Sequence, residues 1–199
     1  MMKYISIKVL FLLIFISLSV SSKADENNGT ISSGNKDSKI IVKVFSSLTC
    51  PHCANFHNKI FKKVEKDFIL KGKVRFEHHA FPLDLAALNA EKILNCHNNK
   101  SQKLSFLHEI YEKQDVWANG SDINKINSSL TKIGKNHGLN DDMIKNCLLD
   151  ENLEDRILNA RIMSGKKYSI KSTPSIFINE KKYEGNHSYK DFKKEIEKF

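Results

Sequence analysis

Early in the chain, apolar and polar positions follow the order of a strand, a helix and a second strand. Residues 40–45 are apolar except for one lysine, as in a strand that is covered on both faces. Residues 54–70 repeat apolar side chains at spacings of three and four, which is typical of an amphipathic helix. Residues 74–79 then alternate, and His78 and His79 at the strand's end are expected to be packed or solvated. This order favours a right-handed parallel unit.

The pattern is helical throughout residues 83–168. Its apolar stripes, such as Ile126 and Leu130, carry no converging acids and bases, so we interpret them as packing surfaces. Strand chemistry returns at residues 176–178, and a last helix opens at Ser188. We therefore predict an α/β fold interrupted by an all-helical insertion.

The N-terminal residues 1–24 have the pattern of a secretory signal, with early lysines, an apolar run at 9–20 and small residues before a cleavage site after Ala24. An uncleaved anchor is the alternative, but the apolar run is shorter than the roughly 20 residues that span a bilayer. Residues 25–38 are polar and contain two glycines, so we predict a flexible lead-in.

Charge adds little evidence of function. The formal charge is +9, and losing a signal that carries three lysines and no acidic residue leaves +6. Only Arg75, Arg156 and Arg161 are arginines, whereas nucleic-acid readers usually use arginine for bidentate contacts. We therefore expect no nucleic-acid partner, although the charge could favour acidic clients through long-range attraction.

The most specific chemistry lies between the first strand and its helix, in the tetrapeptide Cys50-Pro51-His52-Cys53. Two cysteines at this spacing can close a small disulfide, and the first helical turn offers unpaired N–H groups to a thiolate. Pro51 suits the first helical position, which needs no N–H. Cys53 falls on the apolar stripe and Cys50 at the helix start, so one sulfur is presented and the other is shielded.

A metal site is the competing interpretation of this motif. Cys50, Cys53 and His57 have the spacing of part of a zinc or copper cluster. A structural site needs four ligands, and no second pair follows at the usual spacing, so we favour no metal.

Two further cysteines, Cys96 and Cys147, lie in the helical segment at positions that follow its apolar stripes. They could be free buried thiols, which behave as small hydrophobes. Because export places the chain in an oxidising compartment, we prefer a structural disulfide.

Three motifs together make the chain resemble the DsbA-like thiol-disulfide oxidoreductases of bacterial envelopes. They are Cys50-Pro51-His52-Cys53, Phe81-Pro82-Leu83, and Thr173-Pro174 ahead of an apolar strand. The resemblance implies a thioredoxin fold with an inserted all-helical domain. Its thioredoxin domain would comprise residues 39–82 and 169–199, and its helical domain residues 83–168.

The resemblance also implies site roles. Pro174 would be cis, and Thr173-Pro174 would bind substrate backbone beside Cys50. A Cys96–Cys147 pair would match the second disulfide of some alphaproteobacterial members.

In function, the resemblance implies a periplasmic enzyme that introduces disulfides into reduced exported proteins through Cys50 and Cys53. A membrane-bound partner of the DsbB type would reoxidise it, and no cofactor is implied. A reductase or isomerase is the alternative within the class, and a copper- or zinc-binding envelope protein is the alternative outside it. Isomerases of the family tend to be oligomeric, and residues 25–38 show no heptads, so we expect a monomer.

Two positions depart from the family pattern. Members often carry a glutamate six residues before the first cysteine and another after the motif, where this chain has Val44 and His57. His57 lies one helical turn after Cys53, so its imidazole could serve as the proton acceptor. His52 is expected to tune Cys50, by donating a hydrogen bond or carrying a positive charge beside the sulfur.

Overall fold

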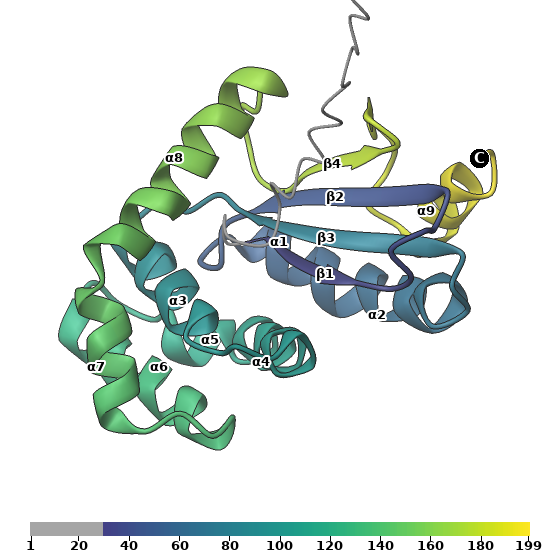
Figure 1. The fold of residues 1–199 in the computed structure, drawn as a ribbon. Coiled ribbons are helices and arrows are strands. Elements are labelled where there is room, and N and C mark those ends of the chain that lie inside the picture. Colours follow the sequence, from purple (N-terminus) through teal and green to yellow (C-terminus); the bar gives the residue numbers. More distant parts are fainter. Residues whose placement is uncertain (1–29) are drawn as a thin grey trace, which may run out of the picture.

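The computed structural model describes residues 30–199, which form one five-stranded sheet and a group of helices at one end of it (Figure 1). The strand order is β1-β3-β2-β4-β5. The strands are β1 (Ile31–Ser33), β2 (Ile40–Ser46), β3 (Val74–Ala80), β4 (Ser175–Ile178) and β5 (Lys181–Lys182). The predicted signal at residues 1–24 lies outside the described residues. Within 30–199, no helix is both long and apolar enough to cross a membrane.

The predicted strand, helix and strand unit is present. β2 and β3 pair in parallel, with Val44 opposite His78, and β4 joins the other side of β2 in antiparallel direction. One continuous helical segment connects β2 to β3. It comprises α1 (Pro51–Phe56), the π-helical η1 (His57–Phe61), α2 (Lys62–Val64) and the π-helical η2 (Glu65–Ile69). Its apolar side packs on the sheet together with α9 (Tyr189–Ile196), as the helical spacing predicts.

The inserted helices also follow the prediction. They are α3 (Leu85–Asn95), α4 (Lys100–Glu112), α5 (Gln114–Trp117), α6 (Ile123–Asn136), α7 (Asp141–Leu149) and α8 (Glu151–Lys167). Side-chain oxygens accept backbone N–H bonds at the starts of five of them, from Asp84, Asn99, Asp122, Asn140 and Asp150. These caps satisfy otherwise orphaned donors and fix where each helix begins. The predicted α/β fold with an all-helical insertion is therefore confirmed.

The two parts share a core at the active-site helix. Cys53 and Ala54 pack with Leu48 and with buried residues of the insertion, including Tyr111 and Trp117. The next turns of the same helical segment pack on the sheet instead. The second cysteine therefore sits where the two parts meet.

The expected flexible lead-in at residues 25–38 is wrong for Ile31–Ser33. This segment is strand β1, which pairs antiparallel with β3 and buries Ile31 opposite His78. A tight turn at Gly34 carries the chain toward β2, with φ +98 and with Val74 O only 2.4 Å from where a Cβ would stand. The single apolar residue in a polar stretch hid the strand, because three residues are too few to show alternation.

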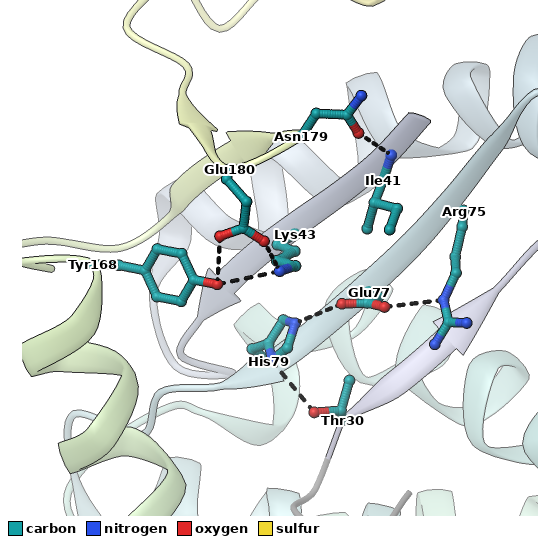
Figure 2. A network of polar contacts seen from close by, with 9 residues as sticks. All are labelled: Thr30, Ile41, Lys43, Arg75, Glu77, His79, Tyr168, Asn179 and Glu180. Atoms are coloured by element: carbon teal, nitrogen blue, oxygen red, sulfur yellow. Dashed lines mark hydrogen bonds and ion pairs between the residues drawn. The ribbon is translucent and has the colours of Figure 1, made fainter. Parts of the chain in front are cut away.

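The outer face of the sheet carries polar side chains, which Figure 2 shows joined in separate sets by hydrogen bonds and ion pairs. Lys43 contacts Tyr168 and Glu180, and Glu77 lies between Arg75 and His79. Because strand side chains alternate, the same strands send Val44 and His78 to the opposite, helix-covered face. His79 is thus bound into a surface network, and His78 is fully buried.

The helical insertion is closed by a disulfide between Cys96, after α3, and Cys147 in α7, across a sequence separation of 51. Both cysteines are half-buried, so the bridge lies at the surface of the insertion rather than in its core.

Replacing both bridge cysteines, C96A/C147A, is expected to lower the free energy of unfolding by about 4 kcal/mol, because the bridge restricts the unfolded chain. Urea denaturation of the two oxidised proteins measures this difference. Equal stability, or peptide mapping that joins Cys96 to an active-site cysteine, would contradict the pairing.

Candidate active site

The Cys50-Pro51-His52-Cys53 motif occupies the turn from β2 into α1. Cys50 is the N-cap residue with extended backbone, and Pro51 takes the first helical position. The Cys50 carbonyl accepts the N–H groups of Cys53 at 3.0 Å and Ala54 at 3.1 Å, which closes the first turn. Cys50 is half-buried, whereas Cys53 is 1% exposed. The helical register therefore presents one sulfur and shields the other, as the sequence predicts.

The segment before β4 completes the site from the far end of the chain. The Thr173–Pro174 peptide bond is cis, and the Cys50 thiol donates to the Thr173 carbonyl at 3.3 Å. The Thr173 hydroxyl is buried and makes no hydrogen bond of ordinary geometry within residues 30–199, but it lies near enough to both sulfurs to lower their pKa. Residues more than 120 positions apart in the chain thus share one surface around Cys50.

The two sulfurs have opposite acidity. A hydrogen bond from the Cys53 thiol is the main reason that the pKa of Cys50 falls to about 5; burial opposes it, and Thr173 and the N–H groups of Cys53 and His52 add to it. Burial raises the pKa of Cys53 well above its ordinary value, and the neighbouring Cys50 raises it further. At neutral pH the reduced site therefore holds a Cys50 thiolate beside a protonated Cys53.

A family model described as thioredoxin matches residues 26–198 of this sequence. Disulfide bond formation protein D of Bacillus subtilis is 30% identical over 174 residues, covering 83% of this chain and 74% of that protein. A Rickettsia bellii protein provisionally named a protein-disulfide oxidoreductase is 32% identical over 160 residues, covering 80% of this chain. The present chain spans 60% of the length of that rickettsial relative.

Solved structures agree. The crystal structure of Wolbachia pipientis alpha-DsbA1 superimposes with a TM-score of 0.79 at 27% identity, over 85% of this chain and 89% of that one. Oxidised BdbD from Bacillus subtilis gives a TM-score of 0.73 at 26% identity, over 85% and 92% of the two chains. The chain belongs to the DsbA-like thiol-disulfide oxidoreductases of the thioredoxin family.

Within this DsbA-like site, the residues expected to tune Cys50 differ in exposure. Pro51 and His52 are both exposed, and His52 acts on Cys50 through its backbone N–H. A role for the His52 imidazole stays a prediction.

His57 lies in the core, 2% exposed, with Nε2 2.9 Å from Nδ1 of His108 on α4. Its ring packs against Tyr111 with centroids 4.6 Å apart. Burial, together with His108, His78 and Lys62, holds the pKa of His57 well below its usual range. No group of three or more His, Cys, Asp or Glu side chains within residues 30–199 could hold a metal ion, so Cys50, Cys53 and His57 do not form such a set.

Reading the sequence alone missed the contribution of the insertion to this DsbA-like site. Gln114 of α5 donates from Nε2 to the carbonyls of Leu48, at 2.7 Å, and Cys50, at 3.1 Å, and so fixes the loop that carries the reactive cysteine. Gln114 continues the helical spacing of the apolar residues before it, so the sequence alone indicates packing at this position. Its polarity on an apolar face was the available signal, because a buried amide requires partners.

In the reduced protein, Cys50 is expected to ionise near pH 5 and Cys53 to stay protonated through neutral pH. Absorbance near 240 nm against pH measures the thiolate, and mass mapping after alkylation at pH 6 identifies the reacting sulfur. Cys53→Ala should raise the Cys50 pKa because it removes the main donor, and Cys53→Ser should raise it less because a hydroxyl still donates. Equal labelling of both cysteines would contradict the burial of Cys53.

The same shift makes stability depend on pH in the reduced form. Because the folded Cys50 pKa lies below that of an unfolded thiol, its contribution is complete above the unfolded value and is lost as pH falls through about 5. Denaturation of the reduced protein between pH 4 and 9, with the oxidised protein as control, measures this loss. If the free energies of unfolding of the reduced and oxidised proteins differ by the same amount at every pH, the predicted loss is contradicted.

Proposed function

We propose that this protein is a periplasmic disulfide oxidase, which transfers the Cys50–Cys53 disulfide to reduced exported proteins. The observation that carries the proposal is the pair of sulfurs at the helix start, where Cys50 is half-buried and Cys53 is shielded. A hydrogen bond from the Cys53 thiol is the main reason that the pKa of Cys50 is lowered to about 5. A stabilised thiolate favours the reduced enzyme, so the oxidised enzyme is a better electron acceptor. Each unit by which the Cys50 pKa falls raises the reduction potential of the two-electron couple by about 30 mV, when only the reduced form is stabilised.

The proposed reaction has two exchange steps. A client thiolate attacks Cys50 Sγ, a client–Cys50 disulfide forms, and Cys53 leaves with the electron pair of the broken bond. A second client thiolate then attacks the client sulfur of the mixed disulfide and releases the Cys50 thiolate. The client loses two electrons, and the enzyme gains them as the Cys50 thiolate and the Cys53 sulfur, which takes up a proton.

Three observations support the role proposed for each residue in this reaction. The half-buried Cys50 is the sulfur that a client can reach, and shielded Cys53 is the leaving group. Thr173 and Pro174 flank Cys50, where they would hold the client backbone. The relatives' names refer to disulfide formation and protein-disulfide oxidoreduction, which is the reaction class proposed here.

The proposal implies a membrane-bound reoxidant of the DsbB type, export with cleavage near Ala24, and a monomeric enzyme. The main competing function is a reductase or isomerase with the same residues. The two differ in direction, which the potential of the Cys50–Cys53 couple decides.

Equilibration with glutathione is expected to give the Cys50–Cys53 pair a potential above that of the glutathione pool. The oxidised protein should also form the disulfide of a reduced client peptide in stoichiometric amount. Mild reductant should open Cys50–Cys53 before Cys96–Cys147. A couple that becomes reduced only under conditions more reducing than thioredoxin requires would replace the oxidase with the reductase.

His52→Ala should raise the Cys50 pKa and shift the potential toward reducing values, by about 30 mV for each pKa unit gained. Asn55→Ala is the matched control, since Asn55 is also exposed on α1 and lies one turn further from Cys50. The glutathione equilibrium of both variants gives the two shifts. A more oxidising His52 variant would contradict the proposed tuning.

A further inference from the structure

Contacts from the inserted helices hold the turn that carries Cys50 into the active-site helix. The turn comprises residues 47–50, and the Cys50 N–H closes it by donating to the Ser47 carbonyl at 3.1 Å. Strand β2 ends at Ser46, where its pairing with β3 also ends, so the turn begins just beyond the sheet. Its geometry therefore depends on contacts with other parts of the fold.

The start of the insertion supplies the first of these contacts. The Leu83 N–H donates to Ser47 Oγ at 3.4 Å, and Thr49 Oγ1 donates to Asp84 Oδ2 at 2.7 Å. The other oxygen of Asp84 caps α3, so the same carboxylate fixes the helix start and the turn. The Leu48 side chain between them is fully buried in the apolar cluster of the insertion.

Gln114 of α5 holds two points of the turn at once. Its Nε2 donates to the carbonyl of Leu48 at 2.7 Å and to the carbonyl of Cys50 at 3.1 Å, which uses both hydrogens of the amide group. Gln114 is 8% exposed and Leu48 is 0% exposed. Because the contact is buried, water is a poor substitute for the amide, and removing Gln114 would withdraw a donor from both carbonyls.

These two bonds restrain the backbone on both sides of the Cys50 Cα atom. On the helix side, the Cys50–Pro51 peptide is planar and the proline ring locks φ of the first helical residue. The soft dihedral that remains between the Cys50 side chain and the helix is ψ of Cys50, which is 119°. The carbonyl oxygen of Cys50 swings when this dihedral changes, so a donor anchored in another helix opposes the change.

The position of the Cys50 sulfur matters in both redox states. In the reduced state Sγ accepts the hydrogen bond of the Cys53 thiol, which is the main cause of its acidity, and lies 3.3 Å from the Thr173 carbonyl. In the oxidised state the attacking sulfur must approach Cys50 in the orientation from which Cys53 can leave. A misplacement of about 1 Å can slow a reaction about a hundred-fold. A rotation at Cys50 would therefore change its acidity and its rate of exchange together.

We propose that Gln114 is a positioning residue for thiol-disulfide exchange: it holds the backbone on both sides of Cys50, so that the Cys50 sulfur stays aligned with Cys53. Thr49 and Asp84 hold the same turn from the side of α3. This role deepens the proposed function and rests on exchange at Cys50 and Cys53. It gives the insertion a part in the chemistry through backbone geometry, without a side chain of the insertion on the reacting sulfurs.

The test compares Gln114→Met with Asn58→Leu. Methionine keeps the length of glutamine and has no donor. Asn58 on η1 also joins the active-site helical segment to the insertion, by donating to the Tyr111 carbonyl on α4 at 3.0 Å, but it makes no contact with the turn. Each variant removes an amide donor from a backbone carbonyl between the two parts of the fold, so both should lose stability in urea. Asn58→Leu therefore shows what a general loosening of this boundary does to the site.

In the reduced protein, Gln114→Met should raise the Cys50 pKa by about one unit, whereas Asn58→Leu should shift it by less than about 0.3 unit. Absorbance near 240 nm against pH measures both values. Because the thiolate loses stabilisation, the glutathione equilibrium at pH 7 should move about ten-fold toward oxidised protein in Gln114→Met. Stopped-flow opening of the Cys50–Cys53 disulfide, expressed per glutathione thiolate, should slow about ten-fold in Gln114→Met and less than about two-fold in Asn58→Leu.

Two further variants keep the test decisive if Gln114→Met does not fold. In Gln114→Glu, the buried carboxyl beside two carbonyls is expected to be protonated and to keep one of the two donors, so its shifts should lie between those of wild type and Gln114→Met. Thr49→Val removes the bond to Asp84, whose exposed carboxylate can take water instead. It should shift the Cys50 pKa and the rate in the same direction as Gln114→Met, by smaller amounts.

Equal shifts of the Cys50 pKa in Gln114→Met and Asn58→Leu would overturn the positioning role, since general loosening would then explain both. An unchanged Cys50 pKa in the Gln114 variants would overturn it as well. None of these measurements needs a client. If the Gln114 variants behave as expected and the wild-type couple proves reducing, the oxidase fails and the positioning role stands. If wild type oxidises a client peptide and Gln114→Met matches Asn58→Leu, the positioning role fails and the oxidase stands.

Discussion

The active site depends on the burial of one sulfur directly behind another. Cys53 is closed off by the insertion and the sheet, so its proton is hard to remove and its thiol remains a donor to Cys50. That donated hydrogen bond is the main reason that Cys50 is acidic. A thiolate at the surface and a thiol in the core are therefore two results of the same packing.

The helical insertion takes part in this arrangement from three sides. Gln114 holds the carbonyls of the active-site loop, Tyr111 packs in the same apolar cluster as Cys53, and Glu91 reaches His78 in the sheet. Each is a polar side chain on a helix face that is otherwise apolar. Because a buried polar group must be paired or must pay a desolvation cost, these few positions tie the insertion to the chemistry.

The two faces of the sheet also divide the polar residues by role. The outer face carries a network whose charges all have partners, and it holds the α8 end and the β4–β5 turn to β2. The inner face packs in an apolar core and also carries the buried His78–Glu91 pair. Alternation along β3 separates His78 from His79, so neighbours in sequence serve different parts of the molecule.

The sequence by itself determined the parts that depend on local spacing. The period of apolar residues located the strands and helices, and the helix start at Pro51 determined which cysteine is presented and which is shielded. The three motifs led to the DsbA-like family, which the comparisons show, and the expected Cys96–Cys147 disulfide is present.

Only the tertiary structure decided which distant groups meet. A three-residue edge strand is too short to show a period, so β1 appeared only through its pairing with β3. Val44 and His57 stand where the family pattern has glutamates, and the sequence could not show which distant groups surround them. In the sheet, Val44 stands beside His78, and α3 brings Glu91 to it from another part of the chain. Such contacts depend on how helices cross a sheet, and that geometry has no signature in the spacing of residues along a single segment.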